Sequence, residues 1–124
     1  MRLPRTPYQY REQMNNVTLI GNLGDRVEMR QGNGEPVATF RVATNKRWKD
    51  REGNQKDSVT WHTVVCFGWV ARAVDGITKG TRVIVIGEAV ERTYQHQDGS
   101  TRYVHEVRAQ FVALVCMDPN PPSK

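Results

Sequence analysis

The chain has 124 residues and a formal net charge of +5 at pH 7, which fits one domain with a modest core. No run reaches the roughly 18 apolar residues of a membrane-spanning helix, and the first residues lack the apolar stretch of a secretory signal. The mild positive excess is compatible with a polyanionic partner but does not identify one, since many soluble proteins carry as much.

The two ends of the chain differ in composition from its middle. Residues 1–14 hold two prolines and no apolar period, so we predict a flexible arm there. A strand-rich domain is predicted over residues 15–117, and a short Pro-rich tail over residues 118–124. The arginines of the arm leave open whether it touches nucleic acid, another subunit or nothing.

Alternating apolar residues, bounded by Gly, Pro, Asn and Asp, predict short strands along the middle of the chain. The strands are predicted at residues 17–20, 26–30, 36–44, 59–67, 82–87 and 107–117. One helix is predicted over residues 69–77, where apolar residues follow a helical spacing. Residues 45–58 are predicted to be a long exposed loop or hairpin tip, and residues 88–106 a long hairpin arm turning at Asp98 and Gly99.

This order of elements predicts an all-β fold. If the first hairpin counts as one bent strand, three strands precede the helix and two follow it. A five-stranded Greek-key barrel with one short helix between strands 3 and 4, and with long β-hairpin loops, is the OB fold. OB folds bind ligands with one face of the barrel and the loops beside it.

Two of the predicted strands are apolar on both faces. Residues 59–67 and 83–86 carry apolar side chains at odd and at even positions. Their outer faces need a cover, which a helix, a loop, a ligand or another subunit can supply, and we expect self-association. The last strand is predicted to have one solvent-exposed face, which includes Arg108, and one face toward the core. The core face is formed by Val107, Ala109, Phe111, Ala113 and Val115.

Signatures of metal sites and of common enzymes do not occur. Cys66 and Cys116 lie in apolar runs outside any CxxC pair, so they are predicted to be buried reduced thiols. His62, His96 and His105 lack HExxH-type spacing, and there is no GxSxG motif or phosphate-binding loop. We therefore expect no metal, no cofactor and no enzymatic activity.

Aromatic side chains are interleaved with basic ones. Single-stranded nucleic acid offers base faces, on which aromatic rings stack at about 1–3 kcal/mol each, and phosphates, which Lys and Arg neutralise. The predicted stacking residues are Trp48, Trp61, Phe67 and Tyr94. The predicted phosphate-binding residues are Lys46, Arg47, Lys49, Arg51, Arg92 and Arg102.

Each of these aromatic residues is also open to a purely structural interpretation. Trp61 and Phe67 share one strand face and could fill the core, and Tyr103 could pack across its hairpin. Trp69 begins the predicted helix and is predicted to be a packing residue. Trp48 fits a core poorly because it lies among charged residues, which favours a role at the surface.

Several blocks resemble, in the same order, the family of bacterial single-stranded DNA-binding proteins. They are residues 16–24 (NVTLIGNLG), 37–40 (VATF), 43–44 (AT), 47–50 (RWKD), 60–68 (TWHTVVCFG), 79–83 (KGTRV) and 98–103 (DGSTRY). The resemblance covers about residues 15–116. It implies an OB fold, a homotetramer and a path of single-stranded DNA wrapped over the subunits, in replication, recombination and repair.

The resemblance also implies roles for particular residues. The family's stacking aromatics fall on Trp48, Trp61 and Phe67, and Tyr94 stands where the family usually has tryptophan. His62 matches a histidine at the family's subunit contact, with a satisfied core histidine as the alternative. The implied location is the bacterial cytoplasm, in association with the nucleoid, rather than the mitochondrion.

Two features depart from the family's pattern. The family's acidic, Phe-ending tail recruits repair and replication proteins, and residues 118–124 do not match it, so such recruitment is not expected. Glu88 and Glu91 also put acid along a hairpin edge that should be basic. These departures keep a second hypothesis open: a replication-restart type of OB module that binds proteins and contacts DNA secondarily. The retained aromatic residues argue against it.

Overall fold

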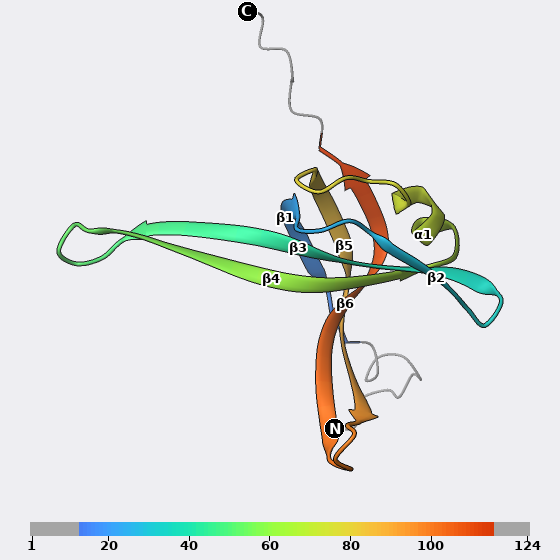
Figure 1. Cartoon of the computed structure of the whole chain (residues 1–124). Coiled ribbons are helices and arrows are strands. Elements are labelled where there is room, and N and C mark those ends of the chain that lie inside the picture. The colour runs from blue at the N-terminus through green and yellow to red at the C-terminus, as the bar shows by residue number, and fades with distance from the viewer. Residues whose placement is uncertain (1–12, 116–124) are drawn as a thin grey trace, which may run out of the picture.

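Strands dominate the part of the chain that the computed structural model describes, residues 13–115. In chain order the elements are β1 (Val17–Leu23), β2 (Glu28–Gly32), β3 (Glu35–Lys49), β4 (Gln55–Phe67), α1 (Gly68–Val74), β5 (Arg82–Gln95) and β6 (Thr101–Leu114). The pairs β3–β4 and β5–β6 extend beyond the barrel as two long arms (Figure 1). Most of the predicted arm 1–14, and all of the predicted tail 118–124, lie outside the described residues.

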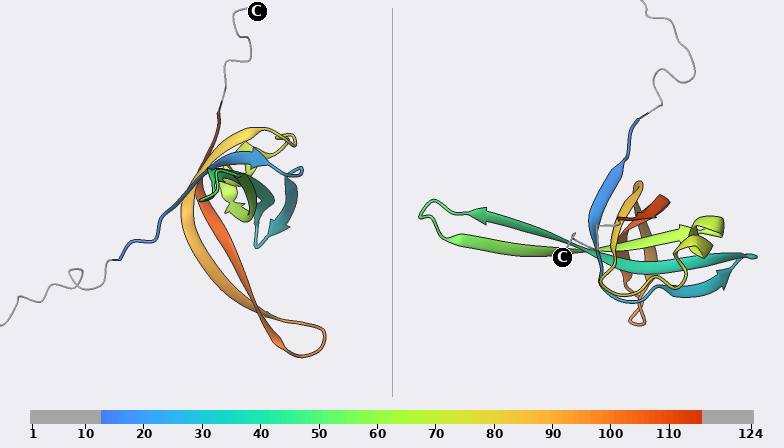
Figure 2. Two further views of the ribbon diagram at one scale, coloured as in Figure 1. Left: turned by 90° about the vertical axis from the view of Figure 1, so that its left-hand side faces the viewer. Right: turned by 90° about the horizontal axis from the view of Figure 1, so that it is seen from above.

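The barrel closes because β1 pairs on both of its sides. It is antiparallel to β5 along most of its length, and at its end it meets β3, where Asn22 faces Ala43. The sheet order is β1-β5-β6-β4-β3-β2. A short parallel pairing, which includes Val65 and Arg108, joins β4 to β6. The predicted OB barrel, with its single helix between β4 and β5, is confirmed, and Figure 2 shows the arms leaving it in different directions.

Small aliphatic side chains fill the barrel. The largest fully buried ones are Leu23, Val42, Val64, Val74, Val83, Val85 and Cys66. Helix α1 packs on the barrel through Val70, Ala71 and Val74. Burial raises the pKa of the Cys66 thiol to about 11. The prediction of a buried free thiol is confirmed for Cys66, whereas Cys116 lies outside the described residues.

Of the two forms predicted for residues 45–58, the structure shows the hairpin. Strands β3 and β4 stay paired as far as Lys49 and Gln55. The turn between them is organised by Asp50, whose side chain accepts hydrogen bonds from the backbone N–H groups of Glu52 and Asn54 at 2.9 and 2.8 Å. The resulting β3–β4 arm is therefore an ordered ribbon and not an irregular loop.

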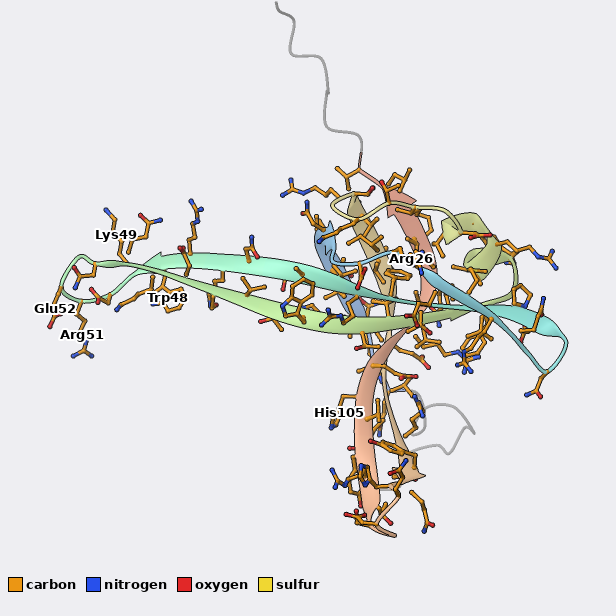
Figure 3. The ribbon with its side chains drawn as sticks, in the orientation of Figure 1. Arg26, Trp48, Lys49, Arg51, Glu52 and His105 are labelled. Atoms are coloured by element: carbon orange, nitrogen blue, oxygen red, sulfur yellow. The ribbon has the colours of Figure 1, made fainter. Side chains whose placement is uncertain are left out.

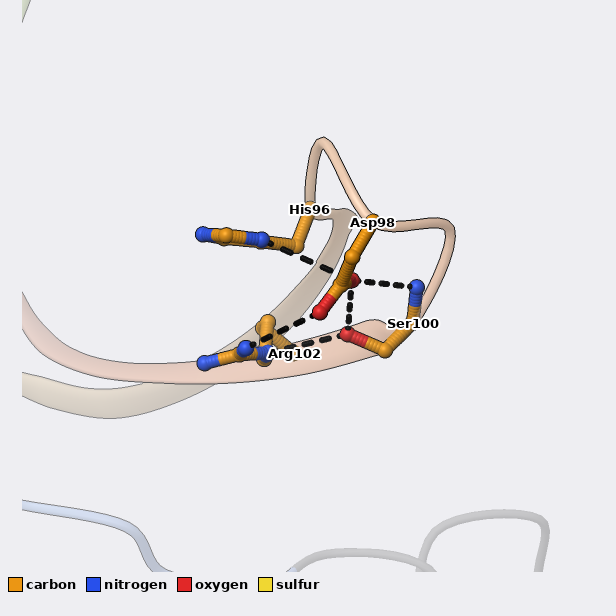
Figure 4. A network of polar contacts seen from close by, with 4 residues as sticks. All are labelled: His96, Asp98, Ser100 and Arg102. Atoms are coloured by element: carbon orange, nitrogen blue, oxygen red, sulfur yellow. Dashed lines mark hydrogen bonds and ion pairs between the residues drawn. The ribbon is translucent and has the colours of Figure 1, made fainter.

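The predicted hairpin arm over residues 88–106 is confirmed as the β5–β6 arm. At its turn, Oδ1 of Asp98 accepts hydrogen bonds from the backbone N–H of Ser100 at 2.9 Å and from its hydroxyl at 2.6 Å (Figure 4). These bonds to Ser100 lower the pKa of the Asp98 carboxyl below its usual value. The carboxylate thus stays charged, and able to hold the turn, at a lower pH than an unbonded one.

A β-bulge changes which side chains of β6 face the core. Gly87 faces Ala109, but the residue before it faces Phe111, so Gln110 is an extra residue on β6. Beyond the bulge the two faces exchange. Phe111 is 47% exposed, while Val112 packs against the core. The prediction that Phe111 shares the inner face with Ala109 is wrong, because one inserted residue reverses the alternation.

Helix α1 is shorter than predicted and leaves Trp69 in solvent. It spans Gly68–Val74 instead of residues 69–77. Trp69 is 73% exposed, so the prediction that it packs is wrong. Its position falls outside the stripe through which this short helix contacts the barrel. In residues 13–115, no helix has the length and apolar character that crossing a membrane requires.

Candidate nucleic-acid interface

Two aromatic rings stand on the outer face of β4. Alternation places Trp61 and Phe67 on the side opposite the buried Val64 and Cys66. Trp61 is 48% exposed and Phe67 is half-buried. Neither ring belongs to the buried core cluster. The interpretation that the two rings fill the core is therefore wrong, and both contribute to the surface of the barrel.

An arginine from another strand covers each ring. Cζ of Arg41 lies 4.6 Å from the ring centroid of Trp61, and Cζ of Arg108 lies 4.4 Å from that of Phe67, both within cation–π range. Neither arginine is among the site residues predicted from the sequence. Only strand register could have revealed them: Arg41 is diagonal to Trp61 across β3 and β4, and Arg108 reaches β4 through the parallel β4–β6 pairing.

The ring of Trp61 lies against the backbone of Gly24. The backbone N–H of Gly24 donates a 2.8 Å hydrogen bond to the carbonyl oxygen of Arg41. A Cβ at position 24 would lie only 2.0 Å from Cζ3 of Trp61. Glycine at position 24 therefore allows the close approach of the indole to the backbone.

A hollow with a volume of about 270 Å³ opens beside Thr63 of β4. Thr63 shares a face of β4 with Trp61 and Phe67, so the hollow opens on the same face as the rings, although neither ring lines it. Its lining residues are Asp25, Arg26, Glu28, Thr39, Phe40, Arg41 and Thr63. Two arginines, two carboxylates and two hydroxyls make the hollow polar without making it uniformly positive.

Trp48, another predicted stacking residue, lies far out on the β3–β4 arm and is 44% exposed. Figure 3 shows Trp48 and Lys49 pointing to opposite sides of the ribbon near its end. A second shallow hollow of about 210 Å³ is lined by Arg47, Trp48, Lys49 and Gln55. By alternation Trp48 belongs to the opposite face of the ribbon from Trp61, so a strand that contacts both must follow the twist of the ribbon.

Positive charge remains available at the end of the β3–β4 arm. Residues 45–58 carry five Lys or Arg and three Asp or Glu, a net charge of +2. Nε of Arg47 lies 3.3 Å from the carboxylate of Asp57, and both groups are exposed. Lys46, Lys49 and Arg51 form no ion pair within residues 13–115. Three predicted phosphate contacts therefore carry uncompensated charge near Trp48.

The β5–β6 arm offers a ring but less free positive charge. Tyr94 is 41% exposed and faces Arg102 across the hairpin. Arg102 lies 3.6 Å from the carboxylate of Asp98, and Nε of Arg92 lies 3.2 Å from that of Glu106. Both predicted phosphate contacts of this arm are thus paired with carboxylates.

The remaining predicted features of this arm are also at the surface. Tyr103 is 64% exposed, so packing across the hairpin buries little of it. Glu91 lies 3.5 Å from Nε2 of His105, which projects from β6 in Figure 3. Glu88 faces Arg108 across β5 and β6. The acidic edge expected from the sequence is present, and it lies beside one of the two ring-covering arginines.

His62 sits where the β3–β4 arm leaves the barrel. Its Nε2 lies 2.9 Å from the hydroxyl of Thr44, and the imidazole is half-buried. It has a hydrogen-bond partner in its own chain, so no catalytic or metal role is needed to explain it. In the part of the chain from residue 13 to residue 115, no three His, Cys, Asp or Glu side chains gather as a metal site would require.

The structure thus divides the predicted site into three regions. Trp61 and Phe67 come together on the barrel with two unpredicted arginines. Trp48 and its lysines lie on the β3–β4 arm, and Tyr94 lies on the β5–β6 arm. A ligand that touches all of the predicted residues must be long and extended.

The chain is similar in sequence to known proteins. Residues 14–115 match the model of the Single-strand binding protein family. The "Single-stranded DNA-binding protein 1" of Xylella fastidiosa (strain 9a5c) is 37% identical over 105 residues, which cover 82% of this chain and 77% of that protein.

Solved structures are similar as well. A structure described as "Plasmodium falciparum SSB complex with ssDNA" has a TM-score of 0.76 and 28% sequence identity with this chain. The match covers 89% of this chain and 100% of that one. A deletion mutant of the single-stranded DNA binding protein from Thermus aquaticus gives a TM-score of 0.75 and 26% identity over 85% of this chain, which spans 52% of that one.

Proposed function

The chain belongs to the single-strand binding protein family, and from this premise we propose that it binds single-stranded DNA without sequence preference. It thereby protects the strand in replication, recombination and repair. The observation that carries the proposal is the outer face of the barrel, where Trp61 and Phe67 present rings beside Arg41 and Arg108. Such an open face suits an extended strand, which offers bases and phosphates along its whole length.

Aromatic rings and basic side chains have different roles in the proposed binding of DNA. We assign base stacking to Trp48, Trp61, Phe67 and Tyr94, and phosphate contact to Lys46, Arg47, Lys49, Arg51, Arg92 and Arg102. Stacking tolerates any sequence because every base has a π-face. The binding domain is residues 15–117, between the arm 1–14 and the tail 118–124, and it acts by binding and not by catalysis. The bacterial relative supports a place in the bacterial cytoplasm.

Tryptophan fluorescence during titration with oligo-dT tests this function. Exposed indoles that stack on bases are expected to be strongly quenched, with saturation at a defined number of nucleotides. Affinity is expected to fall as salt rises, because phosphate contacts release counterions. Binding that neither quenches tryptophan nor depends on salt would contradict the assignment.

A protein-binding OB module remains the second candidate, because ion pairs neutralise Arg92 and Arg102 on the β5–β6 arm. On that hypothesis the arm docks another replication protein and DNA contact is secondary. The exposed rings of Trp48 and Trp61 favour DNA as the first ligand. Capture of a replication protein at high salt, together with weak binding of oligo-dT, would reverse this order.

A second copy of the chain is the proposed cover for an apolar patch on the outer face of β1, β5 and β6. Register places Ile20 beside Ile84, and Ile86 beside Phe111, on one side of the sheet. Ile20 is 57% exposed and Phe111 is 47% exposed. This patch does not include Trp61 or Phe67 of β4, so its burial leaves those two rings open. We propose a homotetramer with His62 at a subunit contact.

Sedimentation equilibrium tests the assembly. We expect a mass about four times that of one chain, because burial of the apolar patch favours association. Phe111→Glu puts a charge into the patch and is expected to lower the mass. Circular dichroism checks that the variant keeps its fold. A monomeric unmodified protein would contradict the proposal.

A further inference from the structure

We infer that Arg41 and Arg108 are exchangeable covers of the two barrel rings. In the free protein each guanidinium occupies a ring, and in the DNA complex each gives up the ring to a base and binds an adjacent phosphate. This inference rests on the proposed function, and it adds two residues and a conformational step to the site.

The geometry places both arginines for such an exchange. Their Cζ atoms lie 4.6 Å from the centroid of Trp61 and 4.4 Å from that of Phe67. Both arginines are exposed, and neither forms an ion pair in the described part of the chain. Each guanidinium therefore contacts a ring and carries a charge that forms no ion pair with a carboxylate in residues 13–115.

The strengths of the two contacts favour the exchange. A cation–π contact at an exposed site is worth about a two- to fivefold preference. A base stacked on an aromatic ring is worth roughly 5- to 150-fold. A base is therefore expected to displace the guanidinium, and the long side chain then remains beside the strand, where a phosphate is its natural partner.

The surroundings indicate where the displaced groups go. Arg41 also lines the hollow on this face of β4, so its side chain has open space to move into beside the ring of Trp61. Asp25 and Glu28 line the same hollow and disfavour a phosphate inside it. Glu88 faces Arg108 across the strands and competes for its charge. The phosphates are therefore expected at the edges of the rings, with the stronger contribution from Arg41.

Salt dependence of oligo-dT binding distinguishes exchange from the simpler roles. Each phosphate contact contributes about 0.7 to the slope of log affinity against log salt for single strands. Arg41→Gln and Arg108→Gln are each expected to flatten the slope by up to this amount, and Arg41→Lys to keep it. Because glutamine leaves the ring uncovered, the variants should bind about two- to fivefold more tightly than the unmodified protein once salt suppresses electrostatics. Plots of log affinity against log salt for a glutamine variant and for the unmodified protein should therefore cross.

The other outcomes would overturn the inference. If the two plots converge at high salt without crossing, the arginines act only as phosphate contacts. Tighter binding at every salt concentration, with an unchanged slope, would make them covers only. Arg72→Gln on α1 removes the same charge from an exposed arginine that covers neither ring, and it should leave the slope unchanged. Failure of the unmodified protein to bind oligo-dT would instead refute the proposed function.

Discussion

Replacing both Trp48 and Trp61 by alanine is expected to weaken oligo-dT binding by about 2–6 kcal/mol, because each ring supplies roughly 1–3 kcal/mol of base stacking. The two losses should add, since one residue lies on the β3–β4 arm and the other on the barrel. Each single variant should lose roughly 5- to 150-fold in affinity. Fluorescence anisotropy of a labelled oligo-dT measures this without using the tryptophans as reporters.

Trp69→Ala is the matched control for these variants. Trp69 is 73% exposed on α1, and its loss should change the affinity by no more than about twofold, as for an ordinary surface substitution. Gly24→Ala tests the geometry of Trp61 by pushing the indole aside, and it should weaken binding in the same direction. If the folded double variant binds as well as the unmodified protein, the strand does not stack on these rings.

Most of the fold follows from local sequence patterns. Alternating apolar residues predict the strands, and Asp98 and Gly99 predict the turn of the β5–β6 arm, because both signals act between near neighbours. The prediction fails at Phe111, where a bulge reverses the alternation. It fails again at Trp69, which lies outside the stripe of Val70, Ala71 and Val74 that packs on the barrel. Both failures depend on tertiary register, which no local pattern contains.

The candidate site is predictable only as far as its rings and its charge excess. Trp48 stands out because charged residues surround it in the sequence. The arginines that cover Trp61 and Phe67 do not stand out, because each comes from another strand and meets its ring only in the folded barrel. The sequence does not reveal ion pairs either. Nothing near Arg92 in the sequence predicts a partner for it, but the carboxylate of Glu106 lies 3.2 Å from its Nε across the hairpin.

One backbone contact connects the bulge with the site. Gly87 is buried at the bulge, and a Cβ there would lie 2.0 Å from the carbonyl oxygen of Arg108 and 2.8 Å from Cα of Ala109. These are backbone atoms, which cannot rotate away as a side chain can. The same stretch of β6 carries the Arg108 guanidinium to the ring of Phe67. The close approach of β5 and β6 at Gly87 therefore fixes the register of these two strands and the position of Arg108 beside Phe67.

Gly87→Ala is accordingly expected to destabilise the fold by about 3 kcal/mol or more, the upper end of overpacking effects, because β5 and β6 must separate to admit the methyl group. For a domain of this size that corresponds to a fall in Tm of roughly 12–24 °C, measured by thermal circular dichroism at matched protein concentration. Gly32→Ala is the control, since its Cβ meets a side-chain methyl of Val37 at 3.1 Å and should cost less than about 1 kcal/mol. Similar Tm values for the two variants would mean that β5 and β6 tolerate a wider spacing, and Gly87 would then owe its place to something other than close approach.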